Sequence, residues 1–342
     1  MAPLPLSVLD LTPVPSGSTS GEALRNTIDL AQAAEGWGYR RYWLAEHHNT
    51  PGLASSAPEV LIGHVAAATT RIRVGSGGIM LPNHSALHVV EAFRVLEALH
   101  PGRIDLGIGR APGTDGITAA ALRGSAALGA EDFPAQLGEL LAYGGEGFPG
   151  GHPFESVRAI PADVPLPPLW ILGSSEYGAQ AAAALGVGFA FARHLNPRGA
   201  EAIMRHYRDA FRPSPEMAEP MAILAISAIA AETAERAEEL ATSMGLGLVR
   251  MRQGRPIPLP SPEEAAAVRY TPHEQDQIRR YRRAQVLGDA EGVREVILEL
   301  AEATAADEVM VMTSVHDHGE RRRSYELIAG ALTPAGVTPA VG

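Results

Sequence analysis

The chain has 342 residues, of which 46% are apolar and 20% charged, a composition that excludes a disordered protein and favours a globular one with a large core. It contains no cysteine, so disulfides, thiol nucleophiles and cysteine-bound metals are excluded. The formal charge is −11 and all 28 lysine-plus-arginine positions are arginine, which argues against a nucleic-acid partner and excludes a pyridoxal Schiff base or a P-loop lysine.

The N-terminal residues predict no targeting signal. Residues 1–5 contain two prolines and no basic residue, unlike a secretory signal peptide. No apolar run approaches the roughly 18 residues that a membrane-spanning helix needs. We therefore expect a cytoplasmic protein with no membrane partner.

Short apolar runs alternate with longer helical patterns over the first 110 residues, at about 30 residues per unit. The first four strands are predicted at residues 6–11, 41–45, 72–77 and 104–109. The first helix opens with a capping box of Thr19 and Glu22 and ends at Gly36. A second helix is predicted at residues 57–68, and a third ends near Pro101.

This rhythm lapses after residue 110 and then returns. Residues 111–165 are predicted to be an insertion. The later strands are predicted at residues 169–172, 188–192, 221–229 and 308–312, and the later helices at 176–185, 197–211, 233–244, 274–287, 290–304 and 320–332. Residues 253–272 are rich in proline and charge without a periodic apolar face, so we predict a mobile loop that acts as a lid. Residues 333–342 are predicted to be a frayed tail.

Eight short strands, each apolar on both faces and followed by a helix, fit a closed (β/α)8 TIM barrel better than an open doubly wound sheet. The insertions then follow strands four and seven. No linker divides the sequence, so we expect residues 1–342 to form a single domain.

In such a barrel, function lies where the strands end and the loops begin. The predicted strand ends carry many polar residues: Asp10, Glu46-His47-His48, Gly77-Gly78, Arg110, Gly173-Ser174-Ser175, Arg193-His194 and Thr313-Ser314. Histidines and arginines at one mouth would suit an anionic ligand with acid–base chemistry beside it. The alternative is that loops are polar in any protein.

The segment Gly173-Ser174-Ser175 leads from a strand into an apolar helix. Small residues at a positive helix end leave backbone N–H groups and hydroxyls free to bind a phosphate, and Arg110 would add a planar charge to the same anion. An ordinary serine N-cap explains the segment equally well. Gly107 to Gly113 superficially resembles a dinucleotide fingerprint, but its spacing is wrong and Pro112 interrupts it.

Adjacent histidines on an extended strand point to opposite sides, so only one of His47 and His48 faces the mouth. Asp10 could orient that histidine or serve a structural role. Two further histidine pairs lack a third ligand at suitable spacing, so no metal site is predicted: His84 with His88, and His316 with His318. The arginine runs at residues 279–283 and 321–323 are expected to be solvated helix faces.

Three motifs resemble those of the bacterial luciferase-like flavin monooxygenases: residues 43–48 (WLAEHH), 73–82 (RVGSGGIMLP) and 101–110 (PGRIDLGIGR). Each falls at the end of a predicted strand. The resemblance implies a barrel that binds reduced FMN, or F420 in related branches, with monooxygenase members forming a flavin C4a-hydroperoxide from O2. The chain also looks like the subfamily that contains tailoring oxygenases of actinobacterial aromatic polyketide pathways.

By this resemblance His47 is the catalytic histidine, and Arg110 and Ser175 lie on the phosphate side of the cofactor. Gly77-Gly78 matches a dipeptide against the flavin ring, where a strained peptide is expected, a cis bond being one form of it. Gly178 stands where the luciferase offers a hydroxyl to the phosphate.

The same resemblance points to a difference beside the flavin. Gly109 replaces a cysteine of the luciferase there, which would leave extra room and argues against unchanged aldehyde chemistry.

The leading hypothesis is an FMN-dependent two-component monooxygenase that receives reduced flavin from a separate reductase and oxygenates a small organic substrate. Its alternatives are an F420-dependent hydride-transfer oxidoreductase and a flavin-binding barrel without turnover. As in the luciferase, a homodimer is expected through the second and third helices, on the apolar residues Leu61, Val65, Val90 and Phe93.

Overall fold

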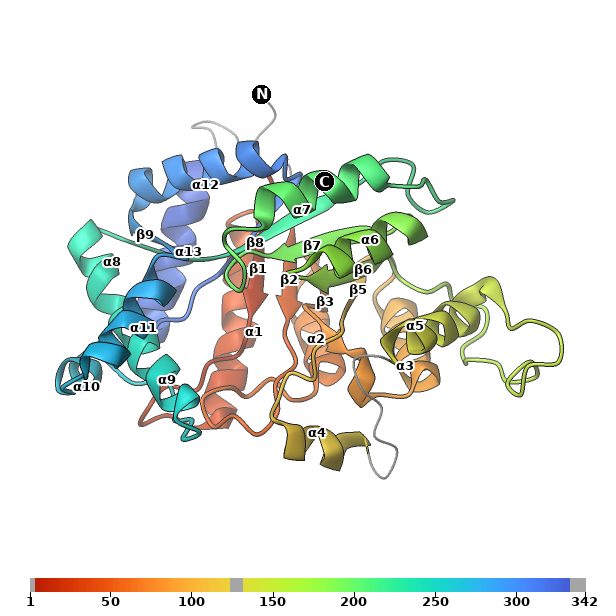
Figure 1. Ribbon diagram of the computed structural model, residues 1–342, viewed down its shortest axis with the longest axis horizontal. Coiled ribbons are helices and arrows are strands. Elements are labelled where there is room, and N and C mark those ends of the chain that lie inside the picture. The colour runs from red at the N-terminus through yellow and green to blue at the C-terminus, as the bar shows by residue number, and fades with distance from the viewer. Residues whose placement is uncertain (1–3, 124–131, 333–342) are drawn as a thin grey trace.

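A computed structural model describes residues 4–123 and 132–332, and eight parallel strands form its centre (Figure 1). They are β1 (Leu6–Asp10), β2 (Arg41–Leu44), β3 (Arg73–Ser76), β5 (Ile104–Gly109), β6 (Leu169–Gly173), β7 (Gly188–Ala192), β8 (Ala222–Ala231) and β10 (Glu308–Met312). Each pairs with the next in this order, and β10 pairs with both β8 and β1. The strands therefore close into the predicted (β/α)8 TIM barrel. The expected tail at residues 333–342 lies outside the described residues.

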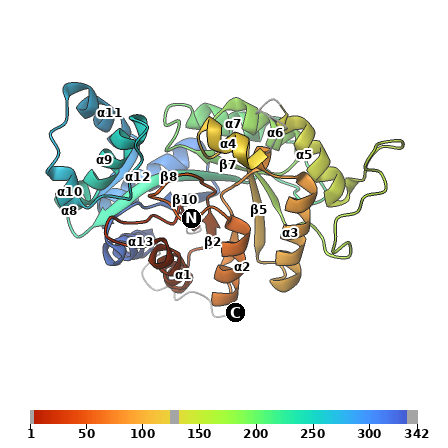
Figure 2. The ribbon, with the colours of Figure 1, turned by 90° about the horizontal axis from the view of Figure 1, so that it is seen from below.

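Helices surround the barrel, and those that follow the pattern predicted from the sequence are α1 (Ser20–Gly36), α2 (Pro58–Ala68), α3 (Ala86–Leu99), α6 (Glu176–Leu185), α7 (Ala200–Ala210), α12 (Ala290–Thr304) and α13 (His318–Leu332). Helices α1, α2 and α3 run along one side of the barrel, and α6 and α7 along the opposite side (Figure 2). Thr19 and Glu22 form the predicted capping box at the start of α1. Periodic apolar faces and caps thus predict these helices well.

Two short strands were not predicted. Strand β4 (Ile79–Met80) pairs with β5, and β9 (Gln285–Asp289) pairs with the C-terminal half of β8. The predicted helix over residues 274–287 is wrong at its end, because α11 (Pro272–Arg282) stops first. A segment as short as residues 284–287, with three apolar residues and one glutamine, fits a strand or a helix, and its pairing with β8 makes it a strand.

The insertions lie where the sequence places them, after β5 and β8. The first contains α4 (Gly116–Arg123), α5 (Phe133–Leu141) and the π-helical turn η2 (Ala142–Glu146), and a 3-10 turn η1 (Leu81–Asn83) lies before α3. The second contains α8 (Ala234–Leu240), α9 (Thr242–Arg252) and α10 (Pro262–Ala266). The single helix predicted at residues 233–244 is therefore wrong, since two helices stand there and the second continues to Arg252.

The segment at residues 253–272 is not irregular throughout, because it contains α10. Ser261 and Glu264 form a capping box at the start of α10, and Thr271 and Glu274 form another at the start of α11. Leu259 is buried and donates its N–H to the carbonyl of Val14 at 2.8 Å. The expected mobility of the segment stays a prediction.

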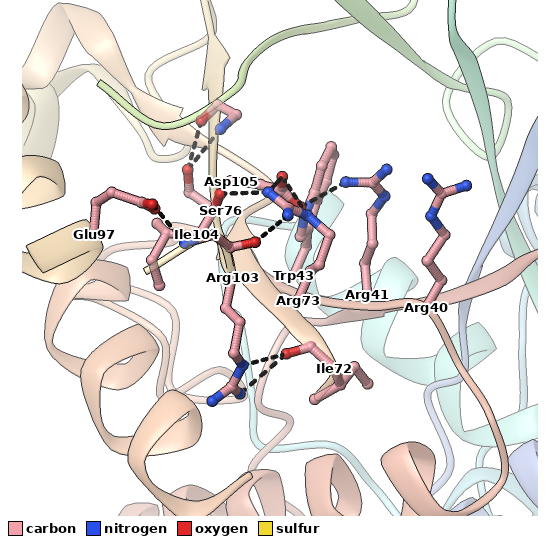
Figure 3. Close-up of polar contacts among 12 residues, drawn as sticks. Arg40, Arg41, Trp43, Ile72, Arg73, Ser76, Glu97, Arg103, Ile104 and Asp105 are labelled. Carbon is pink, nitrogen blue, oxygen red and sulfur yellow. Dashed lines mark hydrogen bonds and ion pairs between the residues drawn. The ribbon is translucent and has the colours of Figure 1, made fainter. Parts of the chain in front are cut away.

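Buried charges close the N-terminal end of the barrel (Figure 3). Arg41 donates to Asp105 at 2.8 Å and to Glu308 at 2.9 Å, and its guanidinium lies 4.8 Å from the ring centre of Trp170. Arg73 donates to the other oxygen of Asp105 at 2.6 Å. These groups satisfy one another below the apolar layers of the barrel, so the open space lies at the opposite end.

Leu61, Val65, Val90 and Phe93, on which the sequence argument placed a dimer face, are buried within the protomer. They pack α2 and α3 against the barrel as part of its main core. The argument that they exceed the needs of one barrel wall is therefore wrong.

Candidate active site

A cavity of about 520 Å³ opens at the C-terminal ends of the barrel strands. Its lining includes all but one of the cofactor and catalytic residues predicted from the sequence: His47, Gly77, Arg110, Gly173, Ser174, Ser175 and Gly178. The remaining residue, Gly78, is not part of the lining. The volume is within the range of small-molecule sites, so these strand-end residues share one cavity that can hold a small molecule.

His47 follows β2 and is held by its backbone, whose N–H donates to the carbonyl of Ser55 at 2.9 Å. Its ring lines the cavity, and Nδ1 is buried without a hydrogen-bond partner in the described structure. Burial lowers the pKa of His47, against the opposing effect of the Glu46 charge. The imidazole is therefore neutral at neutral pH, with one nitrogen able to accept a proton.

Glu46 fixes the loop that carries His47. Its buried carboxylate accepts from the backbone N–H of Met80 at 2.8 Å, and it contacts the Nε2 atoms of His48 and His84, each at 2.9 Å. Burial alone would raise the pKa of Glu46, but the bonds from His84, Met80 and His48 keep it lowered. His47 therefore lines the cavity and His48 does not, as expected, but both follow the end of β2, so the bond of His48 to Glu46 and not strand alternation separates them.

Arg110 and the start of α6 lie at one end of the cavity. The Arg110 guanidinium stacks over the Tyr177 ring at 4.6 Å, and no carboxylate pairs with it within the described ranges. Ser175 is the N-cap of α6, yet its hydroxyl caps no backbone N–H. The ordinary N-cap interpretation therefore does not hold, and the helix end remains available to an anion.

The glycines beside this end let two chain segments approach closely. The Cα of Gly178 would lie 3.6 Å from a Cβ built on Gly173, and a Cβ on Gly178 would lie 3.3 Å from the Phe189 ring. A side chain at Gly178 would therefore press on Phe189, whatever group the site binds.

The Gly77–Gly78 peptide is cis, one of the forms expected from the resemblance. A Cβ on Gly77 would lie 2.6 Å from Leu9 Cδ1, and one on Gly78 would lie 2.8 Å from the carbonyl oxygen of Gly107. Packing inside the barrel therefore requires glycine at both positions, independently of any ring in the cavity.

Gly109 does not leave the extra room that the sequence comparison suggested. A Cβ at this position would lie 3.1 Å from the sulfur of Met80. Met80 itself lines the cavity and occupies the space. The wall beside Gly109 is therefore apolar and formed by a thioether.

His194, just after β7, also lines the cavity; the sequence places it among the polar strand-end residues but assigns it no catalytic or cofactor role. Its Nδ1 lies 3.4 Å from the carbonyl oxygen of Ala225, which can only accept. Burial, reinforced by the proximity of His47, lowers the pKa of His194 to about 4. The ring is therefore neutral, with its proton on Nδ1 and its lone pair on Nε2.

Asp10 does not orient His47. It accepts from the backbone N–H of Thr12 at 2.7 Å, from the Thr27 hydroxyl at 2.7 Å and from Arg321 at 2.5 Å, and from the Tyr42 hydroxyl as well. Asp10 therefore has a structural role.

Arg321 is buried against Asp10, so the expectation of a solvated arginine run is wrong at this position. Its neighbours Arg322 and Arg323 do have half-exposed side chains.

The other histidine pairs bind protein groups. His84 belongs to the Glu46 cluster, and His318 contacts Asp29 at 2.7 Å. Among residues 4–123 and 132–332, no group of three His, Asp or Glu side chains is arranged to hold a metal ion. The functional side chains at the mouth are thus neutral imidazoles and one guanidinium.

The neutral burial of His194 predicts a pH-dependent stability. Its pKa is about 4 in the folded protein and about 6.5 when unfolded, so the unfolded chain binds the proton first as the pH falls. We expect the contribution of neutral His194 to the free energy of unfolding to be complete above pH 6.5 and to fall between pH 6.5 and 4. Urea denaturation at several pH values should show a smaller loss over this interval in His194→Gln than in the unchanged protein. An identical pH dependence in both would contradict the neutral assignment.

Comparison with known proteins agrees with this arrangement. The family model for luciferase-like monooxygenases matches residues 4–308. Bacillus subtilis YvbT is 48% identical over 95% of both chains, and the luciferase-like monooxygenase of Escherichia coli K12 is 43% identical over 94% of this chain and 95% of its own. The chain belongs to the luciferase-like monooxygenase family. It is accordingly an oxidoreductase of the monooxygenase type.

Solved structures of luciferase-like proteins share the fold. Apo-MsnO8 is 39% identical, with a TM-score of 0.87 over 97% of this chain and 99% of its own. At 16% and 15% identity, a 3,6-diketocamphane monooxygenase in complex with FMN and an F420-dependent secondary alcohol dehydrogenase have TM-scores of 0.68 and 0.70. They cover 99% and 97% of this chain, and 100% and 99% of their own. The barrel thus occurs with both cofactor types, and a flavin-type cofactor suits the family.

None of the described helices is both long and apolar enough to cross a bilayer.

Proposed function

We propose that this luciferase-like protein is an FMN-dependent two-component monooxygenase that uses O2 to oxygenate a small organic substrate. The observation that supports this most is the pairing of an unneutralised arginine with an uncapped helix end, both at one end of the cavity. His47 and Gly77 lie along the same lining. A phosphate bound between Arg110 and the start of α6 would direct an attached ring toward His47 and Gly77.

The proposed phosphate site consists of Arg110, Ser174, Ser175 and the first backbone N–H groups of α6. A phosphate accepts hydrogen bonds at several oxygens, and a helix N-terminus favours negative charge. Gly173 and Gly178 keep this end free of side chains. The donors present therefore fit the phosphate of FMN.

The proposed ring site lies against Gly77, with His47 beside it. When bound, reduced flavin supplies the electrons that activate O2 for oxygen transfer. His47 can hold or move a proton there, because its neutral ring has a free nitrogen in a buried position. The Glu46 cluster keeps the loop in place, so the imidazole stays oriented toward the cavity.

A separate reductase would supply the reduced flavin, since the segment that superficially resembles a dinucleotide fingerprint, Gly107 to Gly113, is interrupted by Pro112 and does not suit a nicotinamide cofactor. We place the enzyme in the cytoplasm, where such a reductase would operate. F420-dependent hydride transfer is the competing activity, and a flavin-binding barrel without turnover is the third.

Oxygen uptake with photoreduced FMN, compared with hydride transfer from reduced F420, distinguishes these three functions. Substrate-dependent incorporation of labelled oxygen with FMN would support the proposal. Hydride transfer from F420 without oxygen consumption would overturn it in favour of the second function, and neither activity despite flavin binding would favour the third.

Replacing Arg110 with alanine should weaken FMN binding by about 1.5–3 kcal/mol, or roughly 10- to 150-fold, because a charge-assisted hydrogen bond to phosphate is lost. Calorimetric titration with FMN measures this, and riboflavin, which lacks the phosphate, provides the control. The variant should bind riboflavin as the unchanged protein does. Unchanged FMN affinity would show that the phosphate lies elsewhere.

We also propose a homodimer through α2 and α3, on residues other than those first considered. Val60 on α2 and Val95 and Leu99 on α3 are exposed, with 57%, 46% and 67% of their surface accessible. Leu99→Arg should give a monomer by light scattering at micromolar concentration. Val296→Arg on α12 is the control and should leave the mass unchanged. A monomeric unchanged protein would contradict the proposal.

A further inference from the structure

The charge of the cavity lining carries an inference about the substrate. Among the described residues of the lining there is no aspartate, glutamate or lysine, and Arg110 is the one arginine. Burial favours the neutral form of three other side chains of the lining. Burial lowers the pKa of His47 and that of His194, and burial raises the pKa of Tyr281 to about 12.

Acidic residues near the cavity are turned away from it. Glu46, directly before His47, is fully buried and bound by Met80, His48 and His84. Glu176, the first residue of α6, is exposed to solvent. Neither offers a carboxylate to a molecule inside the cavity, so a cationic substrate finds no counter-charge.

Away from Arg110 the walls are apolar, with thioethers from three directions. Met80 belongs to β4, Met310 and Met312 belong to β10, and Met244 and Met251 belong to α9. Leu248, Ile257 and Leu259 complete the side formed by the insertion after β8. Methionine side chains adapt to irregular apolar shapes and provide no counter-charge for a charged group.

We propose that the substrate is an uncharged, largely apolar molecule held between α9 and the β10 side of the barrel. This rests on the proposed function, because the phosphate of FMN would use the charge of Arg110. A second anion would then lie against apolar walls with no counter-charge among the described lining residues, which is strongly unfavourable. The side chains of α9 that line the cavity then select among neutral substrates by their shape.

Two matched pairs of probes test this: 2-naphthol against 2-naphthoate, and 1-decanol against decanoate. Each pair keeps the apolar part and changes the charge. Binding is measured by calorimetry to the protein saturated with FMN. We expect the neutral member of each pair to bind at least tenfold more tightly. Equal or tighter binding of the carboxylates overturns the proposal, as does no binding of either neutral probe up to its solubility limit.

Arg110→Ala separates this proposal from the proposed function. If carboxylate binding occurs in the unchanged protein and disappears in Arg110→Ala, Arg110 serves the substrate and the phosphate assignment fails. If carboxylate binding persists in Arg110→Ala, the apolar walls accept charge and the substrate class is wrong. FMN titration alone, without any probe, reports on the cofactor site independently.

A gain of charge provides a second readout. Met251 lies on the rim of the cavity with 56% of its surface exposed, so an arginine there should be tolerated by the fold. We expect Met251→Arg to bind both carboxylates at least fivefold more tightly than the unchanged protein. Val296→Arg on α12 is the matched control. Carboxylate affinity that does not differ between these variants would contradict α9 as the substrate wall.

Discussion

His47→Ala should retain flavin affinity within a few-fold, but its rate of product formation should fall roughly 10²- to 10⁴-fold. General acid–base catalysis contributes about that factor to a rate. The ring of His47 lines the cavity with a free buried nitrogen, whereas the proposed flavin anchor lies at Arg110 and α6. Electrons from reduced flavin should then appear as hydrogen peroxide. Labelled product and peroxide are measured in the same reaction, so that uncoupling is distinguished from a general loss of activity.

His48→Ala is the matched control, since the two histidines are neighbours. His48 contacts Glu46 at 2.9 Å and does not line the cavity. Its removal should cost about 1–3 kcal/mol of unfolding free energy and leave most turnover in the folded fraction. If His48→Ala abolishes turnover in a folded protein and His47→Ala does not, the assignment of which histidine serves the reaction is wrong.

The largest loss of stability is expected for Arg321→Met. Arg321 and Asp10 are both buried and lie 2.5 Å apart, and the Arg321 Nε also donates to the carbonyl of Thr313 at 3.0 Å. Removing one member of such a pair leaves an uncompensated buried charge, which costs about 3–5 kcal/mol. Urea denaturation followed by circular dichroism measures this.

Arg322→Met is the control on the same helix, because Arg322 pairs with Asp29 at a half-exposed position and should contribute less than about 1 kcal/mol. Adding Asp10→Asn to Arg321→Met should recover part of the lost stability, since the stranded carboxylate is gone. Equal losses from Arg321→Met and Arg322→Met would refute a buried ion pair.

Asp10 also gives this pair a pH dependence. Burial would raise the pKa of Asp10, but Arg321 and the hydrogen bonds of Tyr42, Thr27 and Thr12 hold it below the ordinary value of 3.8. The folded protein thus binds this proton less readily than the unfolded chain. The Asp10–Arg321 pair therefore contributes fully to the free energy of unfolding above the ordinary pKa of Asp10. This contribution is lost as the pH falls through the lowered pKa of Asp10 in the folded protein.

Most of the barrel could be predicted from the sequence because its signals are local. Alternating strand and helix patterns, a capping box at Thr19 and the stop at Gly36 all act within a few residues. Strand β9 could not be predicted, because its conformation depends on pairing with β8. The capping boxes at Ser261 and Thr271 were local signals that could have been recognised, and they would have placed α10 and α11 correctly.

The positions of the candidate site followed from a single rule, that strand ends meet at the mouth of a barrel. The rule brought His47, Gly77 and Arg110 to one cavity. It could not show that Glu46 holds the His47 loop, nor that Arg321 turns inward to Asp10. Those contacts join residues far apart in the chain, and no local pattern encodes them.

The charged cluster around Arg41 has a consequence for molecular traffic. At the end of the barrel opposite the cavity, Asp105 binds both Arg41 and Arg73 (Figure 3), and Arg41 also binds Glu308. Passage between them would break several buried ion pairs at once. Within the described residues this end of the barrel is closed, and the cavity lies at the other end, where the lining residues Leu195 and Met251 are exposed. A cofactor and a substrate that both occupy this cavity therefore share one side of the barrel, so that binding of one affects the release of the other.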